Sequence, residues 1–72
     1  MSNFSTAILQ YSTGRFGIVG SVPYELSEPV KNSVTLGARN SKVYGTEQEV
    51  IDALLSIGIT HFQKANSEWY DN

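Results

Sequence analysis

The sequence contains no cysteine and only one histidine, so two common ways of stabilising a small fold are missing. Without cysteine there is no disulfide and no thiolate metal site, and one histidine cannot build a zinc site unless several carboxylates lie beside it. We therefore expect a protein that needs no metal and no cofactor. A chain of 72 residues buries only about 60% of the surface that its unfolded form exposes, so an apolar core must hold the fold by itself.

Long apolar runs and a strong excess of one charge are also missing. No run approaches the roughly 20 apolar residues of a membrane span, so we expect no membrane partner. Five basic residues stand against seven acidic ones, and the net charge of -2 disfavours a dedicated nucleic-acid binder. Met1-Ser2-Asn3 leads directly into strand-like sequence without a basic and apolar leader, so we expect a cytoplasmic protein with a single domain over residues 1–72.

The clearest positive signal is an amphipathic helix over residues 46–58. Thr46 and Glu49 have the spacing of a capping box, in which each side chain accepts the backbone N–H of the other residue. Gly58 is placed for a left-handed C-cap. Apolar residues at helical spacing predict one buried face, which consists of Val50, Ile51, Ala53, Leu54, Leu55 and Ile57. Because a helix of about 12 residues is marginal alone, its stability must come from strands that it covers.

Strands are predicted on both sides of this helix. Residues 4–11 and 15–22 are rich in β-branched and aromatic residues and indicate a β-hairpin. Alternation predicts a third strand over residues 34–39, continued after a turn or bulge by residues 42–44, and a fourth over residues 59–65. The predicted fold is therefore α+β, with a small mixed or antiparallel sheet of about four strands and one helix on one face, in the order ββ-β-α-β. A right-handed crossover would make the third and fourth strands parallel.

The hairpin has two candidate registers. A three-residue loop with Gly14 in the left-handed region pairs Tyr11 with Arg15 and distributes apolar side chains over both faces. A two-residue loop at Thr13-Gly14 gathers most of them on one face. That face then carries Ser5, Ala7, Leu9 and Tyr11 with Phe16, Ile18, Gly20 and Val22. Because a slip by one residue moves a whole apolar set into water, we take the two-residue loop.

The connections carry further signals. Pro23 lacks a ladder donor and should end the second strand, so residues 22–29 become a connection with one short helical turn. In the tail over residues 66–72, Trp69 and Tyr70 either fold back on the core or stay exposed as interface anchors.

No group of residues in the sequence has a catalytic arrangement. His61 falls in a predicted strand and has neither a cysteine nor an assigned base beside it. Glu47, Glu49 and Asp52 lie in the first turns of the predicted helix, where negative charge complements the helix dipole. We therefore expect a protein that is not an enzyme.

The most motif-like stretch is residues 14–20, with three glycines at a spacing of three. Its GXXG pattern is typical of a loop that contacts nucleic acid, but such a loop joins two helices, whereas this one opens a strand. Ile18 also stands where an RNA-recognition motif has a second aromatic residue. We interpret these glycines as turn and strand residues that allow close approach of the backbone.

The stretches GRFGIVGSVP, residues 14–23, and SKVYGTEQE, residues 41–49, carry a resemblance. In them the chain resembles short uncharacterised proteins of phages and mobile elements. The resemblance implies no specific activity. Together with the small size and the missing catalytic groups, it leads to the hypothesis of a non-enzymatic protein-binding module, such as a phage-type inhibitor of a host protein.

The predicted working surface is the sheet face away from the helix, because one helix covers only one face. The residues expected to bind the partner are Ile8, Gln10, Arg15, Val19, Arg39, His61, Trp69 and Tyr70. The partner would be a protein, such as a host protein, or a second copy of the chain. The alternative is a nucleic-acid-binding module that uses Arg15, Arg39 and His61 on the same face.

Overall fold

The computed structural model of the chain describes residues 5–31, 34 and 36–71. Its elements, in chain order, are β1 (Thr6–Gln10), β2 (Phe16–Gly20), the 3-10 helix η1 (Tyr24–Leu26), β3 (Ser27–Pro29), β4 (Arg39–Ser41), α1 (Glu47–Ser56), β5 (His61–Gln63) and β6 (Trp69–Asp71). Phe4, Thr35 and Asn72, which the sequence analysis assigned to the first strand, the third strand and the tail, lie outside the described residues.

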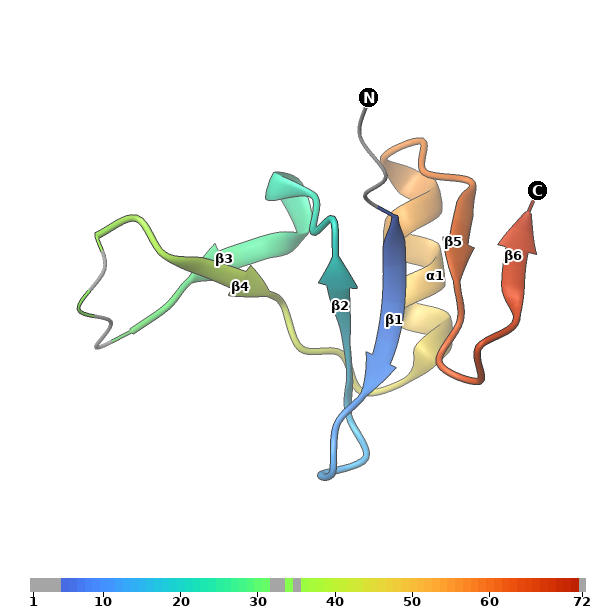
Figure 1. Ribbon diagram of the computed structural model, residues 1–72, viewed down its shortest axis with the longest axis horizontal. Helices are drawn as coiled ribbons and strands as arrows, with labels where there is room; N and C mark the ends of the chain where they lie inside the picture. The colour runs from blue at the N-terminus through green and yellow to red at the C-terminus, as the bar shows by residue number, and fades with distance from the viewer. Residues whose placement is uncertain (1–4, 32–33, 35, 72) are drawn as a thin grey trace.

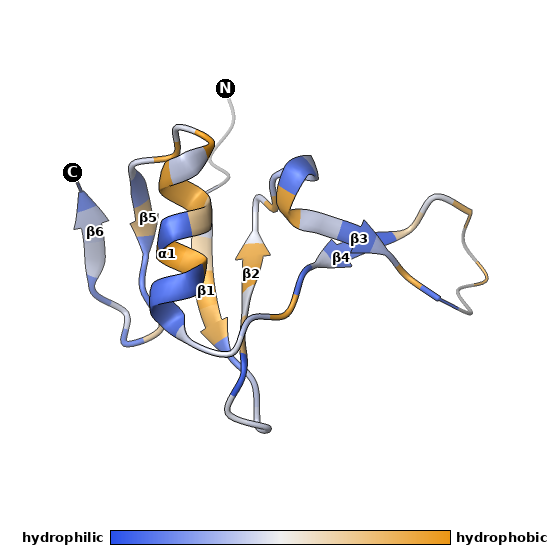
Figure 2. Cartoon of the chain, turned by 180° about the vertical axis from the view of Figure 1, so that it is seen from behind, coloured by the Kyte–Doolittle hydropathy of each residue, from blue (hydrophilic) through white to orange (hydrophobic). Residues whose placement is uncertain are grey.

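The described strands form a four-stranded sheet in the order β2-β1-β5-β6 and a separate pair, β3-β4 (Figure 1). β1 runs antiparallel to β2 and parallel to β5, and β5 runs antiparallel to β6. α1 lies across one face of the larger sheet, as the view from behind shows (Figure 2). The predicted α+β fold, with a mixed sheet of four strands and one helix on one face, is therefore confirmed.

Both predicted ends of the helix are confirmed. The Glu49 N–H donates to Thr46 Oγ1 over 3.3 Å and the Thr46 N–H donates to Glu49 Oε1 over 3.0 Å, which completes the capping box. At the other end Gly58 has a φ of +86°. The Ile59 N–H reaches the Leu54 carbonyl and the Gly58 N–H reaches the Leu55 carbonyl, each over 3.0 Å, which is a Schellman ending.

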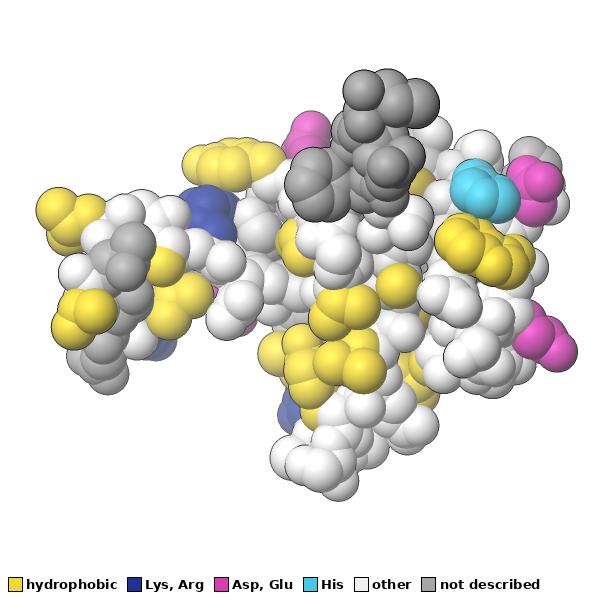
Figure 3. Space-filling model, in the orientation of Figure 1, with side chains coloured by type: hydrophobic (Ala, Val, Ile, Leu, Met, Phe, Trp, Pro, Cys, Tyr) yellow, Lys and Arg dark blue, Asp and Glu magenta, His cyan; other side chains and the backbone are white. Residues whose placement is uncertain are grey.

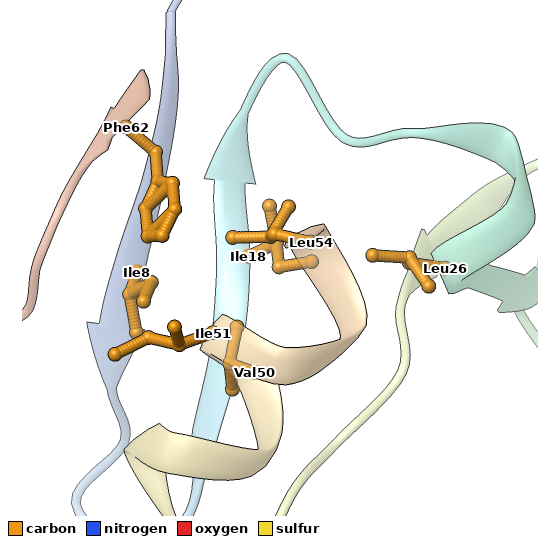
Figure 4. Close-up of a cluster of buried hydrophobic side chains, with 7 residues drawn as sticks. All are labelled: Ile8, Ile18, Leu26, Val50, Ile51, Leu54 and Phe62. Carbon is orange, nitrogen blue, oxygen red and sulfur yellow. The ribbon is translucent and has the colours of Figure 1, made fainter. Parts of the chain in front are cut away.

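The apolar face of α1 packs on side chains from the sheet. Val50 and Leu54 are completely buried, and Phe62 of β5 is equally inaccessible. The cluster in Figure 4 contains Ile8, Ile18, Leu26, Val50, Ile51, Leu54 and Phe62. Leu26 comes from η1, the short helical turn that the sequence predicts between the second and third strands.

The register chosen from burial for the first hairpin is wrong. The Tyr11 N–H donates to the Arg15 carbonyl over 2.7 Å, so a three-residue loop joins the strands, with Gly14 at a φ of +88°. Ile8 consequently lies opposite Ile18. The turn residue decided the register, because glycine adopts the left-handed conformation at little cost. The burial argument failed because it assumed one apolar face, whereas this sheet carries apolar residues on both.

The predicted third strand does not join the main sheet. Residues 39–41 form β4 and pair with β3 at residues 27–29, which the sequence analysis treated as a connection. The parallel pair is therefore β1 with β5, and not the third predicted strand with the fourth. Tyr44 makes an isolated bridge to Phe16 on the outer side of β2, with two N–H to carbonyl distances of 2.8 Å. β4 pairs instead with β3, which lies closer to it in the sequence than β1 or β5 does.

The tail folds back on the body as β6. Trp69 pairs with Gln63, and Tyr70 pairs with Phe62. The rings of Tyr70 and Phe62 are stacked, with centroids 4.7 Å apart and an angle of 10° between the planes. One of the two aromatic residues of the tail therefore supports the core.

Replacing Leu54 by alanine should remove about 2–5 kcal/mol from the free energy of unfolding, because it opens a cavity under α1. A core of this size supplies only ~3–5 kcal/mol, so the variant should lose a large part of the stability of the parent. Leu9→Ala is the matched control, since Leu9 is 42% exposed. Urea denaturation followed by circular dichroism measures both. Equal stability of the two variants would mean that α1 does not bury this face.

Replacing Thr46 by alanine should cost about 1 kcal/mol of stability, because the Glu49 N–H loses its acceptor at the start of α1. Thr46→Ser keeps a hydroxyl at the N-cap and should lose less. Thermal melts of the three proteins would show the order parent, Thr46→Ser, Thr46→Ala. A Thr46→Ala protein that melts with the parent would contradict a stabilising role for this cap.

Candidate functional site

The face of the main sheet turned away from α1 is the candidate binding surface, and we call it the open sheet face. No helix or strand among the described residues covers it, and Figure 3 views it directly. Alternation along each strand assigns side chains to this face or to the helix side. The open sheet face comprises Ala7, Leu9, Tyr11, Gly17, Val19, His61, Gln63, Trp69 and Asp71.

Its centre over β1 and β2 is apolar (Figure 3). Leu9 pairs with Gly17 and Ala7 pairs with Val19, so Leu9 and Val19 are diagonal neighbours. Leu9 is 42% exposed and Val19 is 36% exposed. These two large apolar side chains therefore meet solvent side by side on a sheet that has no second layer.

Tyr11 extends this apolar centre toward the hairpin turn. A Cβ atom added to Gly17 would lie only 2.8 Å from the ring atoms Cε2 and Cζ of Tyr11. The ring therefore lies directly on the backbone of β2, where any side chain would displace it. Gly17 is buried by this contact although it faces outward. The glycine thus lets an aromatic ring lie flat against the sheet.

The β5–β6 end of the face carries a stacked aromatic pair. The rings of His61 and Trp69 are 4.9 Å apart between centroids and inclined by only 10°. Asp71 Oδ1 lies 3.7 Å from His61 Nδ1, and Trp69 remains 52% exposed. The Gln63 side chain donates to the Ser67 carbonyl over 3.0 Å, which ties the β5–β6 turn to the face. This end is aromatic and polar, in contrast to the aliphatic centre.

Three of the residues predicted to bind a partner, Val19, His61 and Trp69, lie on the open sheet face. Ile8 and Tyr70 do not: the placement of Ile8 on this face was wrong, and Tyr70 takes the first of the two alternatives for the tail, folding back on the core. Ile8 is buried in the core, because the three-residue turn rotates it toward α1. Tyr70 points to the helix side, where it stacks on Phe62.

The remaining predicted residues lie at the margins. Gln10 is exposed on the same side of β1 as Ile8, so its placement on the face away from α1 was wrong. Its Nε2 lies 3.5 Å from the Gly14 carbonyl. Arg15 is exposed at the hairpin turn. Arg39 belongs to β4, outside the main sheet, so its assignment to this face was also wrong.

Arg39 instead holds the base of the β3–β4 pair. Its Nε donates to Ser27 Oγ over 2.9 Å and its NH2 donates to the Ser27 carbonyl over 3.1 Å. Its guanidinium carbon lies 4.1 Å from the centre of the Tyr24 ring. This arginine is thus engaged in contacts within its own part of the chain.

Sequence reasoning missed Leu9, Tyr11 and Ala7 as members of the face. The signal that could have found them was Gly14, since a left-handed glycine at that position selects the three-residue loop and its register. The alternation of side chains along β1 was predicted correctly, but each of the two sets of side chains was assigned to the wrong face of the sheet.

Within residues 5–31, 34 and 36–71, no group of three or more His, Asp or Glu side chains is gathered closely enough to hold a metal ion. Burial raises the pKa of the Tyr44 hydroxyl, and the nearby carboxylate of Glu28 raises it further. This hydroxyl therefore stays protonated at neutral pH, beside the outer side of β2. The open sheet face itself carries few charges, which suits binding by apolar contact.

Over the described part of the chain, no helix is both long enough and apolar enough to span a membrane. Comparisons with protein-family models, with curated proteins and with solved structures give no match.

Trp69 is the single tryptophan of the chain, so its fluorescence reports on the stacked pair. Removing the imidazole exposes one face of the indole to water, so we expect His61→Ala to shift the Trp69 emission maximum to longer wavelength. His61→Phe keeps a ring on which the indole can stack and should emit close to the parent, with circular dichroism as the check that both variants fold. If His61→Ala emits like the parent, the two rings are not in contact.

Proposed function

We propose that this chain is a small, non-enzymatic, protein-binding module, of the kind that a phage-type inhibitor of a host protein would use. The observation that carries the proposal is the apolar centre of the open sheet face, where Leu9 and Val19 are exposed side by side. The proposal keeps the cytoplasmic location expected from the sequence.

The composition of the face supports a protein as the partner. Interface centres in proteins are rich in aromatic and aliphatic side chains, while polar and charged residues lie at the rim. The centre of the open sheet face has this apolar character, with Leu9, Val19 and Tyr11. Its rim is polar, with Gln63, His61 and Asp71. Trp69 is the natural anchor, because tryptophan is among the residues that contribute most to binding energy.

The side chains on this face are also partly held in place before binding. Tyr11 lies on the backbone of β2 and Trp69 is stacked on His61. Aromatic side chains already ordered by their neighbours lose less conformational entropy on binding than free ones do. The ordering of Tyr11 and Trp69 therefore supports a binding role for the open sheet face over that of an ordinary solvated sheet surface.

A nucleic-acid-binding module is the alternative, and one observation favours it. Bases stack on exposed aromatic rings, and the parallel His61–Trp69 pair offers such a platform. Against it, Arg39 belongs to the other sheet and Asp71 places a carboxylate beside the platform. A binding constant that falls steeply with salt would support this alternative over the protein partner.

To test the proposal, we would capture partners from the native host with immobilised chain, purify the protein identified, and measure its dissociation constant. Leu9→Thr/Val19→Thr keeps β-forming residues but removes apolar surface from the face. We expect this double variant to bind at least about tenfold more weakly, which corresponds to about 1.4 kcal/mol.

The control is Gln48→Ala/Ser56→Ala, which changes two exposed residues on the opposite side of the molecule and retains good helix formers. It should bind like the parent. If the Leu9→Thr/Val19→Thr protein folds and binds with the parent affinity, the open sheet face is not the binding surface.

A further inference from the structure

β3 and β4 form a strand pair that projects from the body (Figure 1). We call this pair, together with the described residues 30, 31, 34, 36–38 and 42, the arm. The strands pair from Ser27 with Ser41 to Pro29 with Arg39, and the Val30 N–H continues the ladder to the Ala38 carbonyl over 2.9 Å. Beyond this ladder, the two described apolar residues of the loop, Val34 and Leu36, are fully exposed. Exposed apolar groups at the end of a projection mark a contact with another molecule.

The chain exposes more surface than a compact monomer of its size. The accessible surface is 5048 Å², whereas a folded monomer of 7.9 kDa is expected to expose roughly 4,400 Å². The radius of gyration is 12.3 Å, against about 11 Å for a compact domain of this length.

Charge is distributed unevenly between the arm and the other end of the molecule. Residues 27–42 contain three basic residues and one acidic residue, and carry a net charge of +2. Residues 43–71 contain five acidic residues and one basic residue, but three of the acidic residues belong to α1, on the other side of the sheet. Residues 57–71, which include β5 and β6, contain two acidic residues and one basic residue and carry a net charge of -1. Glu68 and Asp71 are exposed at the β5–β6 end, which lies across the molecule from the arm (Figures 1 and 3). The arm therefore cannot reach the acidic end of its own chain.

We propose that the arm of one copy docks on the open sheet face of a second copy, with its basic residues beside Glu68 and Asp71, and that the second copy does the same in return. The inference rests on the proposed function, because it takes the open sheet face as a protein-binding surface. A two-fold arrangement with the faces opposed brings each arm to the β5–β6 end of the other copy. It also covers both sets of apolar groups, those of the loop and those of the face.

The area available suits such a dimer. A stable interface buries about 800 Å² on each partner, which is roughly one sixth of the surface of this chain. The opposite net charges of the arm and the acidic end favour this pairing over arm against arm, where like charges would meet. A second copy would thus bury the exposed apolar groups and pair the opposite charges in one interface.

The test is a charge exchange followed by sedimentation. Lys31 and Lys42 are exposed on the arm, and Lys31→Glu/Lys42→Glu reverses their charges without touching Arg39, which holds the base of the arm. Glu68→Lys/Asp71→Lys reverses the acidic end. In either variant alone the arm and the end of the facing copy have the same sign. We expect each to dimerise at least about tenfold more weakly than the parent.

Mixing the two variants gives the decisive result. In the mixed dimer both contacts again join opposite charges, so the mixture should form a heterodimer with close to the parent affinity. Raising the salt from about 0.05 M to about 0.5 M should weaken the parent dimer, because exposed charges are then screened. A parent that stays monomeric up to about 1 mM, or variants that fail to recover on mixing, would overturn the proposal.

Two further variants separate this inference from the proposed function. Val34→Asp/Leu36→Asp alters fully exposed loop residues and should abolish the dimer without affecting folding. Leu9→Thr/Val19→Thr should weaken the dimer through the face. If only Leu9→Thr/Val19→Thr weakens the dimer, the open sheet face remains a binding surface and the proposed role of the arm is overturned. If only Val34→Asp/Leu36→Asp weakens it, the proposed role of the open sheet face is overturned. An arm that binds a captured host protein, in a chain that remains monomeric, would assign the arm to that protein.

Discussion

The packing of α1 on one face of the main sheet is the contact on which the rest of the structure depends. Val50 and Leu54 are completely buried against side chains of β1, β2 and β5, in a chain with no disulfide to support them. A helix of ten residues is too short to be stable alone, so sheet and helix stabilise each other. The same contact limits the fold, because one short helix covers only one face. The second apolar surface of the sheet, with Leu9 and Val19, is therefore exposed.

The residues of the open sheet face follow from this limit and from the hairpin turn. Gly14 selects the register that turns Leu9 and Val19 outward, and the bare backbone at Gly17 gives Tyr11 a place to lie. At the other end, Trp69 rests on His61 while its neighbour Tyr70 completes the core. In β6, Tyr70 thus packs in the core while the adjacent Trp69 is exposed. In the proposed function, such a face would bind by shape and apolar contact, with a polar rim that gives orientation.

The arm adds a second surface of a different kind. It is basic at its flanks and apolar at its loop, whereas the helix and the β5–β6 end are acidic. Arg39 of β4 is bonded to Ser27 of β3 and lies over the Tyr24 ring of η1, so these contacts hold the strand pair together and join it to the 3-10 helix before it. In the proposed dimer, the arm of each copy would cover the open sheet face of the other copy, so that both sets of exposed apolar groups leave water together.

The sequence by itself determined the helix, its two ends, the hairpin, the helical turn at η1 and the α+β class. These features depend on local chemistry: the Thr46–Glu49 capping box, the glycine at position 58, and the spacing of apolar residues. Only the tertiary structure decided that β4 pairs with β3 outside the main sheet, that β1 lies beside β5, and that Ile8 is core while Leu9 is surface. The reason is that strand pairing and the choice of buried face are set by partners distant in the sequence. When both faces of a hairpin are apolar, alternation alone does not say which face the helix covers.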